Sequence, residues 1–140
     1  MLAAVALILV AWPLAPLIRQ DQGYHGFADQ RAWLGVQNAA DVLSNLAFAL
    51  VGVVGVWGLL SHRRARFNSA TEIGLWLIAL GILGTAFGSA WYHLNPTDAT
   101  LFWDRLPMTI VFAGVLGTAI AQRLSEDAGR WSLAVLLLFG

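Results

Sequence analysis

Long stretches without a charged residue are the feature that most limits how this chain can fold. Val42–Ser61 and Ile73–Tyr92 are each twenty residues long and contain no Asp, Glu, Lys or Arg. Leu106–Gln122 is seventeen residues long and is equally uncharged. A helix crosses the hydrocarbon core of a bilayer with about 20 mostly apolar residues, within a range of about 17–25. These stretches therefore predict membrane-spanning helices over 42–61, 73–92 and 106–122.

The two ends of the chain add one uncharged stretch each. Residues 1–18 precede the first charged side chain, and we interpret them as an uncleaved N-terminal transmembrane helix, with a signal peptide as the alternative. The ten residues of Trp131–Gly140 rise only about 15 Å in a helix, against a hydrocarbon core of about 30 Å. We therefore expect four spans plus a truncated fifth helix over 131–140, in a fragment of a longer membrane protein; a short re-entrant or interfacial tail is the alternative.

The composition agrees with a membrane protein and disfavours several other classes. Hydrophobic residues make up 59% of the 140 residues and charged residues 11%, whereas soluble domains contain about 25% charged residues. The net charge is zero, so the electrostatic footprint of a nucleic-acid-binding protein is missing. The chain has no cysteine, which excludes disulfides, thiolate catalysis and cysteine-bound zinc. The sequence predicts an all-α fold, a polytopic transmembrane helix bundle.

Arginines in the connecting segments set the expected orientation. The segments 62–72 and 123–130 contain five arginines, whereas the other side has three, Arg19, Arg31 and Arg105. The positive-inside rule then places 62–72 and 123–130 in the cytoplasm. Alternation of the spans puts 20–40 and 93–104 together on the opposite side, which in a bacterial inner membrane is the periplasmic face. The aromatic residues expected at that interface are Trp91, Tyr92 and Trp103.

Most of the unusual polar side chains gather beside these last two segments. Ser89 and His93 are four residues apart and therefore share one face of their helix. Ionisable residues near a membrane interior cost free energy and are usually functional, so Ser, His and Asp side chains at one depth predict a site. The polar residues on this side are His25, Asp29, Asn38, Asp41, Ser44, Asn45, Ser89, His93, Asn95, Asp98 and Asp104.

Several of these residues also have a purely structural interpretation. Asp41 and Asp104 can cap the N-termini of their helices, and we expect Asp104 to open a helix that has Pro107 in its first turn. Ser44 and Asn45 lie on the same helix face as Asp41 and are expected to form hydrogen bonds between helices.

The string S-x3-H-x10-D-x-L-P-M begins at Ser89 and includes His93 and Asp104. It resembles the core of the alkaline ceramidase family, which belongs to a superfamily of seven-helix membrane hydrolases and related receptors. Asp41–Leu46 is similar to the start of the first core helix in that family. The resemblance covers about residues 24–108 and implies that 19–140 is a partial ceramidase-like transmembrane domain.

The resemblance implies an integral-membrane amidase that hydrolyses the N-acyl bond of ceramide-like lipids. It implies a zinc ion held by three histidines, of which His93 matches the first, and it matches Ser89 and Asp104 to the catalytic residues. The other two histidines of the family form an H-x3-H pair on the last helix, which we expect beyond the end of this chain. A catalytic zinc takes three protein ligands and one open position, so we expect the fragment alone to be inactive.

Calcium is not predicted. Animal members of the family carry a calcium site before the first core helix, but its acidic pattern is not reproduced here: Asp29 is the nearest candidate, and Asn38 stands where an acidic residue is expected. His25 and Asp29 can instead order an interfacial loop. Two other functions remain open: a hydrolase of another lipid-linked ester or amide, and a non-catalytic membrane receptor or transporter.

Overall fold

The computed structural model describes residues 20–27, 29–61 and 67–139, and their regular structure is helical. The all-α prediction is therefore confirmed for these residues, while the helix expected over 1–18 lies outside them. The elements are η2, a short 3-10 helix (Gln22–His25), and the α-helices α2 (Ala39–Ser44), α3 (Leu46–Ser61), α4 (Ser69–Leu94), α5 (Asp98–Arg123) and α6 (Glu126–Phe139).

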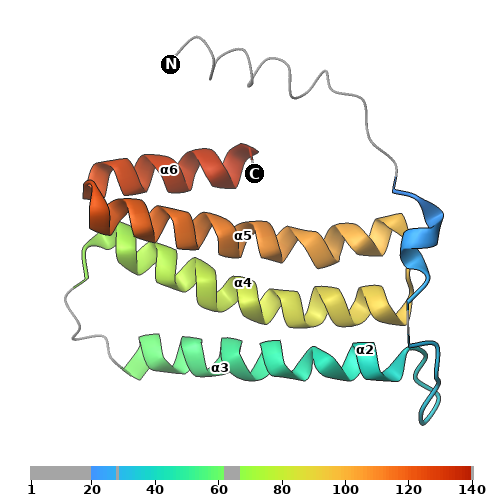
Figure 1. Ribbon diagram of the computed structural model, residues 1–140. Coiled ribbons are helices and arrows are strands. Elements are labelled where there is room, and N and C mark those ends of the chain that lie inside the picture. Colours follow the sequence, from blue (N-terminus) through green and yellow to red (C-terminus); the bar gives the residue numbers. More distant parts are fainter. Residues whose placement is uncertain (1–19, 28, 62–66, 140) are drawn as a thin grey trace.

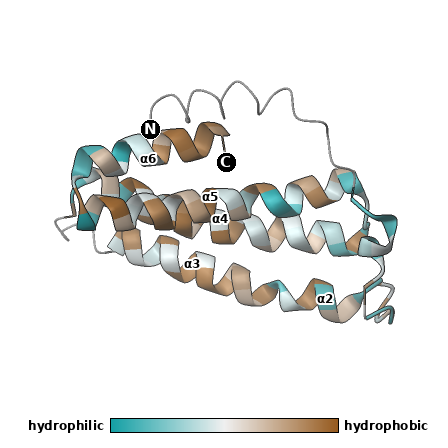
Figure 2. Cartoon of the chain, turned by 45° about the horizontal axis from the view of Figure 1, so that its top comes forward, coloured by the Kyte–Doolittle hydropathy of each residue, from teal (hydrophilic) through white to brown (hydrophobic). Residues whose placement is uncertain are grey.

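Three stretches of the described residues are long and apolar enough to cross a membrane, namely Ala39–Ser61, Ser69–Leu94 and Asp98–Arg123. Hydrophilic residues gather toward the two ends of the bundle, and hydrophobic residues cover its middle (Figure 2). Many large apolar side chains of α3 are exposed, as expected of a helix that faces lipid: Leu46, Phe48, Leu50, Val51, Val53, Val54 and Trp57. These features are consistent with an integral membrane protein.

The helices lie side by side in the order α3, α4, α5, α6, with successive helices antiparallel (Figure 1). The start of α2, the end of α4 and the start of α5 therefore meet at one end of the bundle. Only Asn95, Pro96 and Thr97 connect α4 to α5. The segments 20–40 and 93–104 lie together at this end, because hydrogen bonds join them directly.

The start of α5 differs from the prediction. The helix begins at Asp98, eight residues before the expected span 106–122 and six before Asp104, which was expected to open it, because Thr97 caps the helix and forms a capping box with Thr100. Asp104 therefore lies in the second turn of α5 and does not open or cap the helix. Pro107 lies inside the helix and not in its first turn. Charged side chains near the end of a span do not stop a helix, so the uncharged stretch underestimated its length.

The other spans also extend beyond their uncharged cores. The helix expected over 73–92 covers 69–94, and the one expected over 131–140 covers 126–139. At 14 residues, α6 is shorter than the roughly 17 residues that a span requires.

The helix expected over 42–61 begins earlier and is interrupted. Asn38, and not Asp41, occupies the N-cap position of α2, and Asn45 separates α2 from α3. The Ser44 hydroxyl and the Asn45 amide both donate to the carbonyl of Asp41, at 2.7 and 2.9 Å. The expected hydrogen bonds between helices are therefore wrong, because these side chains bond to the nearby backbone instead.

Glycines let α4 and α5 approach closely. A Cβ atom built on Gly88 would lie 2.0 Å from the carbonyl oxygen of Trp103, and one built on Gly84 would lie 3.2 Å from Cβ of Pro107. Pro107 has no N–H to donate to the carbonyl four residues earlier, which is that of Trp103. The Trp103 carbonyl oxygen, which lacks its helical donor, thus lies against Gly88. The Gly84–Gly88 pair forms the contact between the two helices.

We expect Gly88→Ala to destabilise the protein by about 1–3 kcal/mol, because the new methyl group forces two helix backbones apart. Gly58→Ala is the matched control, since a Cβ atom built there meets no atom within 4 Å. Alanine favours a helix over glycine by up to about 1 kcal/mol, so the control should keep or raise the melting temperature. Thermal unfolding in detergent micelles measures both variants, and equal losses would contradict the close contact.

Candidate functional site

Ser89 and Asp104 are both buried where α4 meets α5. Ser89 is 8% exposed and Asp104 is 7% exposed. A Cβ atom built on Gly88, next to Ser89, would lie 3.3 Å from the backbone nitrogen of Asp104. Ser89 and Asp104 are therefore at one level of the bundle. His93 follows one helical turn after Ser89, next to the last residue of α4. The three residues singled out by their spacing thus line the same end of the α4–α5 contact.

Two side-chain atoms of this group are buried without a hydrogen-bond partner among the described residues. They are Nδ1 of His93 and Oδ1 of Asp104. Buried polar atoms in proteins nearly always have a partner, so an exception calls for an explanation such as a catalytic role or a bound ion. An imidazole nitrogen in this state can ligate a metal, and a carboxylate oxygen can accept a proton.

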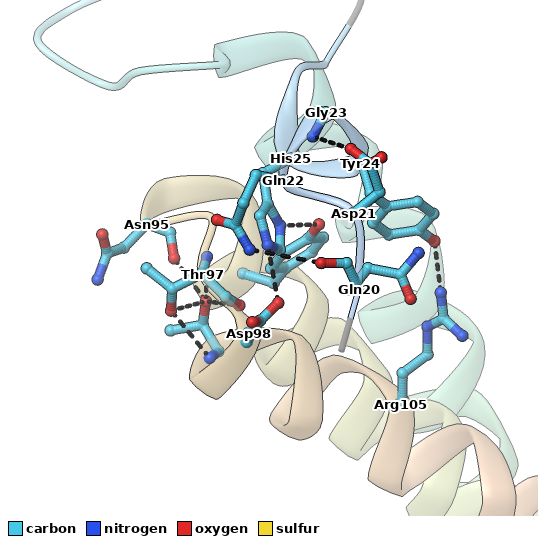
Figure 3. A network of polar contacts seen from close by, with 12 residues as sticks. Gln20, Asp21, Gln22, Gly23, Tyr24, His25, Asn95, Thr97, Asp98 and Arg105 are labelled. Atoms are coloured by element: carbon cyan, nitrogen blue, oxygen red, sulfur yellow. Dashed lines mark hydrogen bonds and ion pairs between the residues drawn. The ribbon is translucent and has the colours of Figure 1, made fainter. Parts of the chain in front are cut away.

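Arg105 brings a positive charge to the outer edge of the site. Its Nε atom lies 3.9 Å from Oδ2 of Asp104. The guanidinium also donates a hydrogen bond to the hydroxyl of Tyr24 and lies over the tyrosine ring, 5.6 Å from its centroid (Figure 3). The two oxygens of Asp104 therefore have different surroundings: one faces a cation, and the other has no hydrogen-bond partner within the described part of the chain.

His25 connects η2 to both helices of the site (Figure 3). Its Nε2 atom lies 3.0 Å from Oδ1 of Asp98, and its Nδ1 atom lies 2.9 Å from the hydroxyl of Tyr92. Since a carboxylate accepts, Nε2 donates to Asp98, and in the neutral ring Nδ1 accepts from Tyr92. Tyr92 is 3% exposed, so its ring packs within the protein, and its hydroxyl is directed to the half-buried His25 ring.

The segment before α2 also covers His93. The Phe27 ring lies 4.5 Å from the His93 ring, centroid to centroid. The Asn38 amide donates to the His93 carbonyl oxygen at 2.7 Å, although Asn38 occupies the N-cap position of α2 and its side chain makes no capping bond there. Loop and helix together therefore hold the histidine.

Asp29 supplies the cap that Asn38 does not. Its carboxylate accepts from Nε of Arg31 at 2.5 Å and from the backbone N–H of Ala40 at 2.9 Å. The Arg31 hydrogen bond, followed by the Ala40 N–H, holds the pKa of the Asp29 carboxyl below its usual value. The hydrogen bond to Asp29 in turn raises the pKa of Arg31. Asp29 orders the loop, as its structural interpretation expects.

Among the described residues, His93 is the histidine that the family resemblance matches to a zinc ligand. The described residues contain no group of three or more His, Cys, Asp or Glu side chains placed to hold a metal ion. Both ring nitrogens of His25 are already hydrogen-bonded, and His62 lies outside the described residues. Comparison of the chain with protein-family models, curated proteins and solved structures finds no match.

Sequence reasoning missed Tyr92 and Phe27 as neighbours of the site. It counted Asp98 and His25 among the polar residues but did not pair them, because they are 73 residues apart. The one sequence signal for this pairing was the alternation of the spans, which places the segments 20–40 and 93–104 on the same side of the membrane.

The capping bond of Asp29 should depend on pH. A folded-state pKa below the usual value means that the bond stabilises the fold above pH 3.8 and is lost as the pH falls through the lower, folded-state pKa. We expect the Ala40 amide to be protected from hydrogen exchange at neutral pH and to lose protection in strong acid, after correction for the intrinsic rate. Asp29→Asn should remove most of this pH dependence, whereas Asp127→Asn, a change of an exposed carboxylate in α6, should keep it. NMR of the protein in micelles measures both, and an unchanged pH dependence of Ala40 protection in Asp29→Asn would contradict the assignment.

Proposed function

We propose that the chain carries part of the active site of a membrane-embedded, zinc-dependent amide hydrolase, similar to the alkaline ceramidases, that cleaves the N-acyl bond of ceramide-like lipids. The observation that best supports this proposal is a pair of buried atoms close to the buried Ser89, namely Nδ1 of His93 and Oδ1 of Asp104, which find no hydrogen-bond partner in the ranges that the structure describes. A metal-ligand role for His93 and a proton-acceptor role for Asp104 would explain why these two polar atoms are buried.

His93 is the proposed zinc ligand from this part of the chain. The buried Nδ1 atom fits that role, because a neutral imidazole nitrogen without a hydrogen-bond partner is free to ligate a metal. In the proposal the remaining ligands are the H-x3-H pair that the family resemblance implies. A bound zinc ion would supply an activated water and polarise the amide carbonyl.

Asp104 and Ser89 take the proton-transfer and charge-stabilising roles. Asp104 acts as the general base that accepts the proton of the attacking water and then delivers it to the leaving amine. Ser89 donates a hydrogen bond to the oxyanion that develops on the carbonyl oxygen. Arg105, 3.9 Å from the second carboxylate oxygen, places a positive charge beside Asp104.

An apolar cavity of about 130 Å³ supports a lipid substrate. Thr85 and Met108 in its wall lie one helical turn deeper in the bundle than Ser89 and Asp104, respectively. The cavity suits the end of a hydrocarbon chain whose polar group lies at the site. Its lining residues are Phe48, Ile82, Thr85, Met108, Val111 and Phe112. We further propose that the site faces the periplasm of a bacterial inner membrane, on the basis of the arginine distribution.

The test uses the protein as its gene encodes it, including any residues that follow Gly140, reconstituted in vesicles with a fluorescent short-chain ceramide. We expect His93→Ala to lose bound zinc, measured by mass spectrometry, together with hydrolysis. Asp104→Asn should keep zinc and lower kcat by about 10²–10⁴-fold. Ser89→Ala should keep zinc and lower kcat by about 10²–10³-fold.

Two changes in α6 provide matched controls. Ser132→Ala removes a hydroxyl that donates locally to the Gly129 carbonyl, and Asp127→Asn removes an exposed carboxylate; both should leave kcat unchanged. Full ceramide hydrolysis by His93→Ala would reject the proposed function. Hydrolysis of a lipid ester without hydrolysis of ceramide would reject the substrate class but keep the chemistry.

A further inference from the structure

A two-residue turn before α2 exposes a strained leucine. Trp33 and Val36 exchange backbone hydrogen bonds of 3.0 and 2.9 Å, and the residues between them have φ angles of 50° (Leu34) and 81° (Gly35). Glycine adopts this left-handed conformation readily, whereas leucine is strained by it. Leu34 is nevertheless 83% exposed and the adjacent Trp33 is 59% exposed. Internal packing therefore does not explain why the turn carries two large apolar side chains.

The hairpin, residues 31–36, lies at the depth expected for the membrane surface. Two residues separate it from Ala39, the first residue of a stretch long and apolar enough to cross a membrane. In Figure 1 it projects at the lower right, beside the start of α2 and away from α4 and α5. Tryptophan is enriched at this depth, because its ring is apolar while its N–H remains hydrogen-bonded.

A hollow of about 340 Å³ separates the hairpin from the outer side of α2. Arg31 stands at its edge with a side chain that is 84% exposed. The Asp29 carboxylate accepts a hydrogen bond from Nε of Arg31. The rest of the guanidinium is accessible, because the side chain is so exposed. The lining is otherwise apolar: Ala32, Trp33, Ala39, Ala40 and Leu43 accompany Asp29 and Arg31.

We propose that this hairpin is a phospholipid-binding surface. Trp33 and Leu34 insert into the lipid surface, Arg31 donates hydrogen bonds to the phosphate of a phospholipid, and an acyl chain of that lipid lies in the hollow against Leu43. The proposal rests on the membrane-spanning helices and on the hairpin, and it is independent of the proposed hydrolase activity.

The chemistry of the hairpin favours a phospholipid over a protein partner. The bilayer around the Ala39–Ser61 helix places lipid beside the hairpin at all times, so no encounter is needed. The fork of N–H groups in arginine matches a phosphate, and an apolar floor next to it matches the chain attached to that phosphate. The hollow thus presents polar and apolar groups in the order in which a phospholipid carries them.

The absence of cysteine from the sequence allows a clean test by site-directed spin labelling. The full chain is reconstituted in phosphatidylglycerol vesicles with a nitroxide on Leu34→Cys or, as a matched control, on Gln37→Cys, an exposed position of the same loop. We expect the label at 34 to be accessible to oxygen and protected from a water-soluble nickel complex, and the label at 37 to show the reverse. Equal accessibility of both labels to nickel overturns the proposal.

A second arm tests the role of the phosphate. Arg31→Gln, added to the Leu34→Cys chain, should raise the nickel accessibility of the label several-fold in phosphatidylglycerol vesicles. It should have no such effect in vesicles of digalactosyldiacylglycerol, a lipid without phosphate. Because the Gln substitution also leaves Asp29 without its cation in both lipids, an equal effect in both would reject the phosphate contact.

Leu34→Asn separates lipid contact from folding. Asparagine tolerates the left-handed conformation better than leucine, so the melting temperature in micelles should stay the same or rise. A clear fall would mean that the fold itself needs the leucine side chain, which contradicts a surface kept for lipid.

Discussion

The close approach of α4 and α5 is the constraint on which the rest of the structure depends. Pro107 inside α5 withholds an N–H from the Trp103 carbonyl, and that oxygen lies against Gly88, where any side chain would collide with it. The proline ring also packs near Gly84. Inside a membrane the hydrophobic effect does not drive helices together, so small residues and close packing must do so. This contact places Ser89 and Asp104 at one level of the bundle.

The polar end of the bundle is built differently, from hydrogen bonds that connect distant parts of the chain. His25 reaches Tyr92 and Asp98, and Asn38 reaches the backbone of His93. These bonds position a loop over the last turn of α4, where an unsupported histidine would be free to change rotamer. The site therefore combines a rigid wall from two packed helices with a cover from the segment that precedes them.

The sequence allowed the spans to be predicted because charge is excluded from the bilayer core over a known length. Helix ends were harder to predict, since α5 starts at a threonine cap that precedes two acidic residues of the same helix, Asp98 and Asp104. The spacing of Ser89, His93 and Asp104 was readable because it is local or nearly so. The bond from His25 to Asp98 was not, because no periodicity relates residues in a loop to residues in a helix 73 positions later. Likewise, the deviation at Asn45 came from side chains that can bond either to a neighbouring helix or to their own backbone.

The three-residue turn between α4 and α5 has a consequence for the order of assembly. These two helices are neighbours in sequence and carry complementary surfaces, so they can pair as soon as both have entered the membrane, as contacts of short sequence separation generally form fast. The segment with η2 leaves the ribosome earlier, yet its partners Tyr92, His93, Asp98 and Arg105 are made 55 to 81 residues later. The segment with η2 can therefore form these hydrogen bonds only after α4 and α5 have paired. The loop packs over His93 after these two helices are in contact.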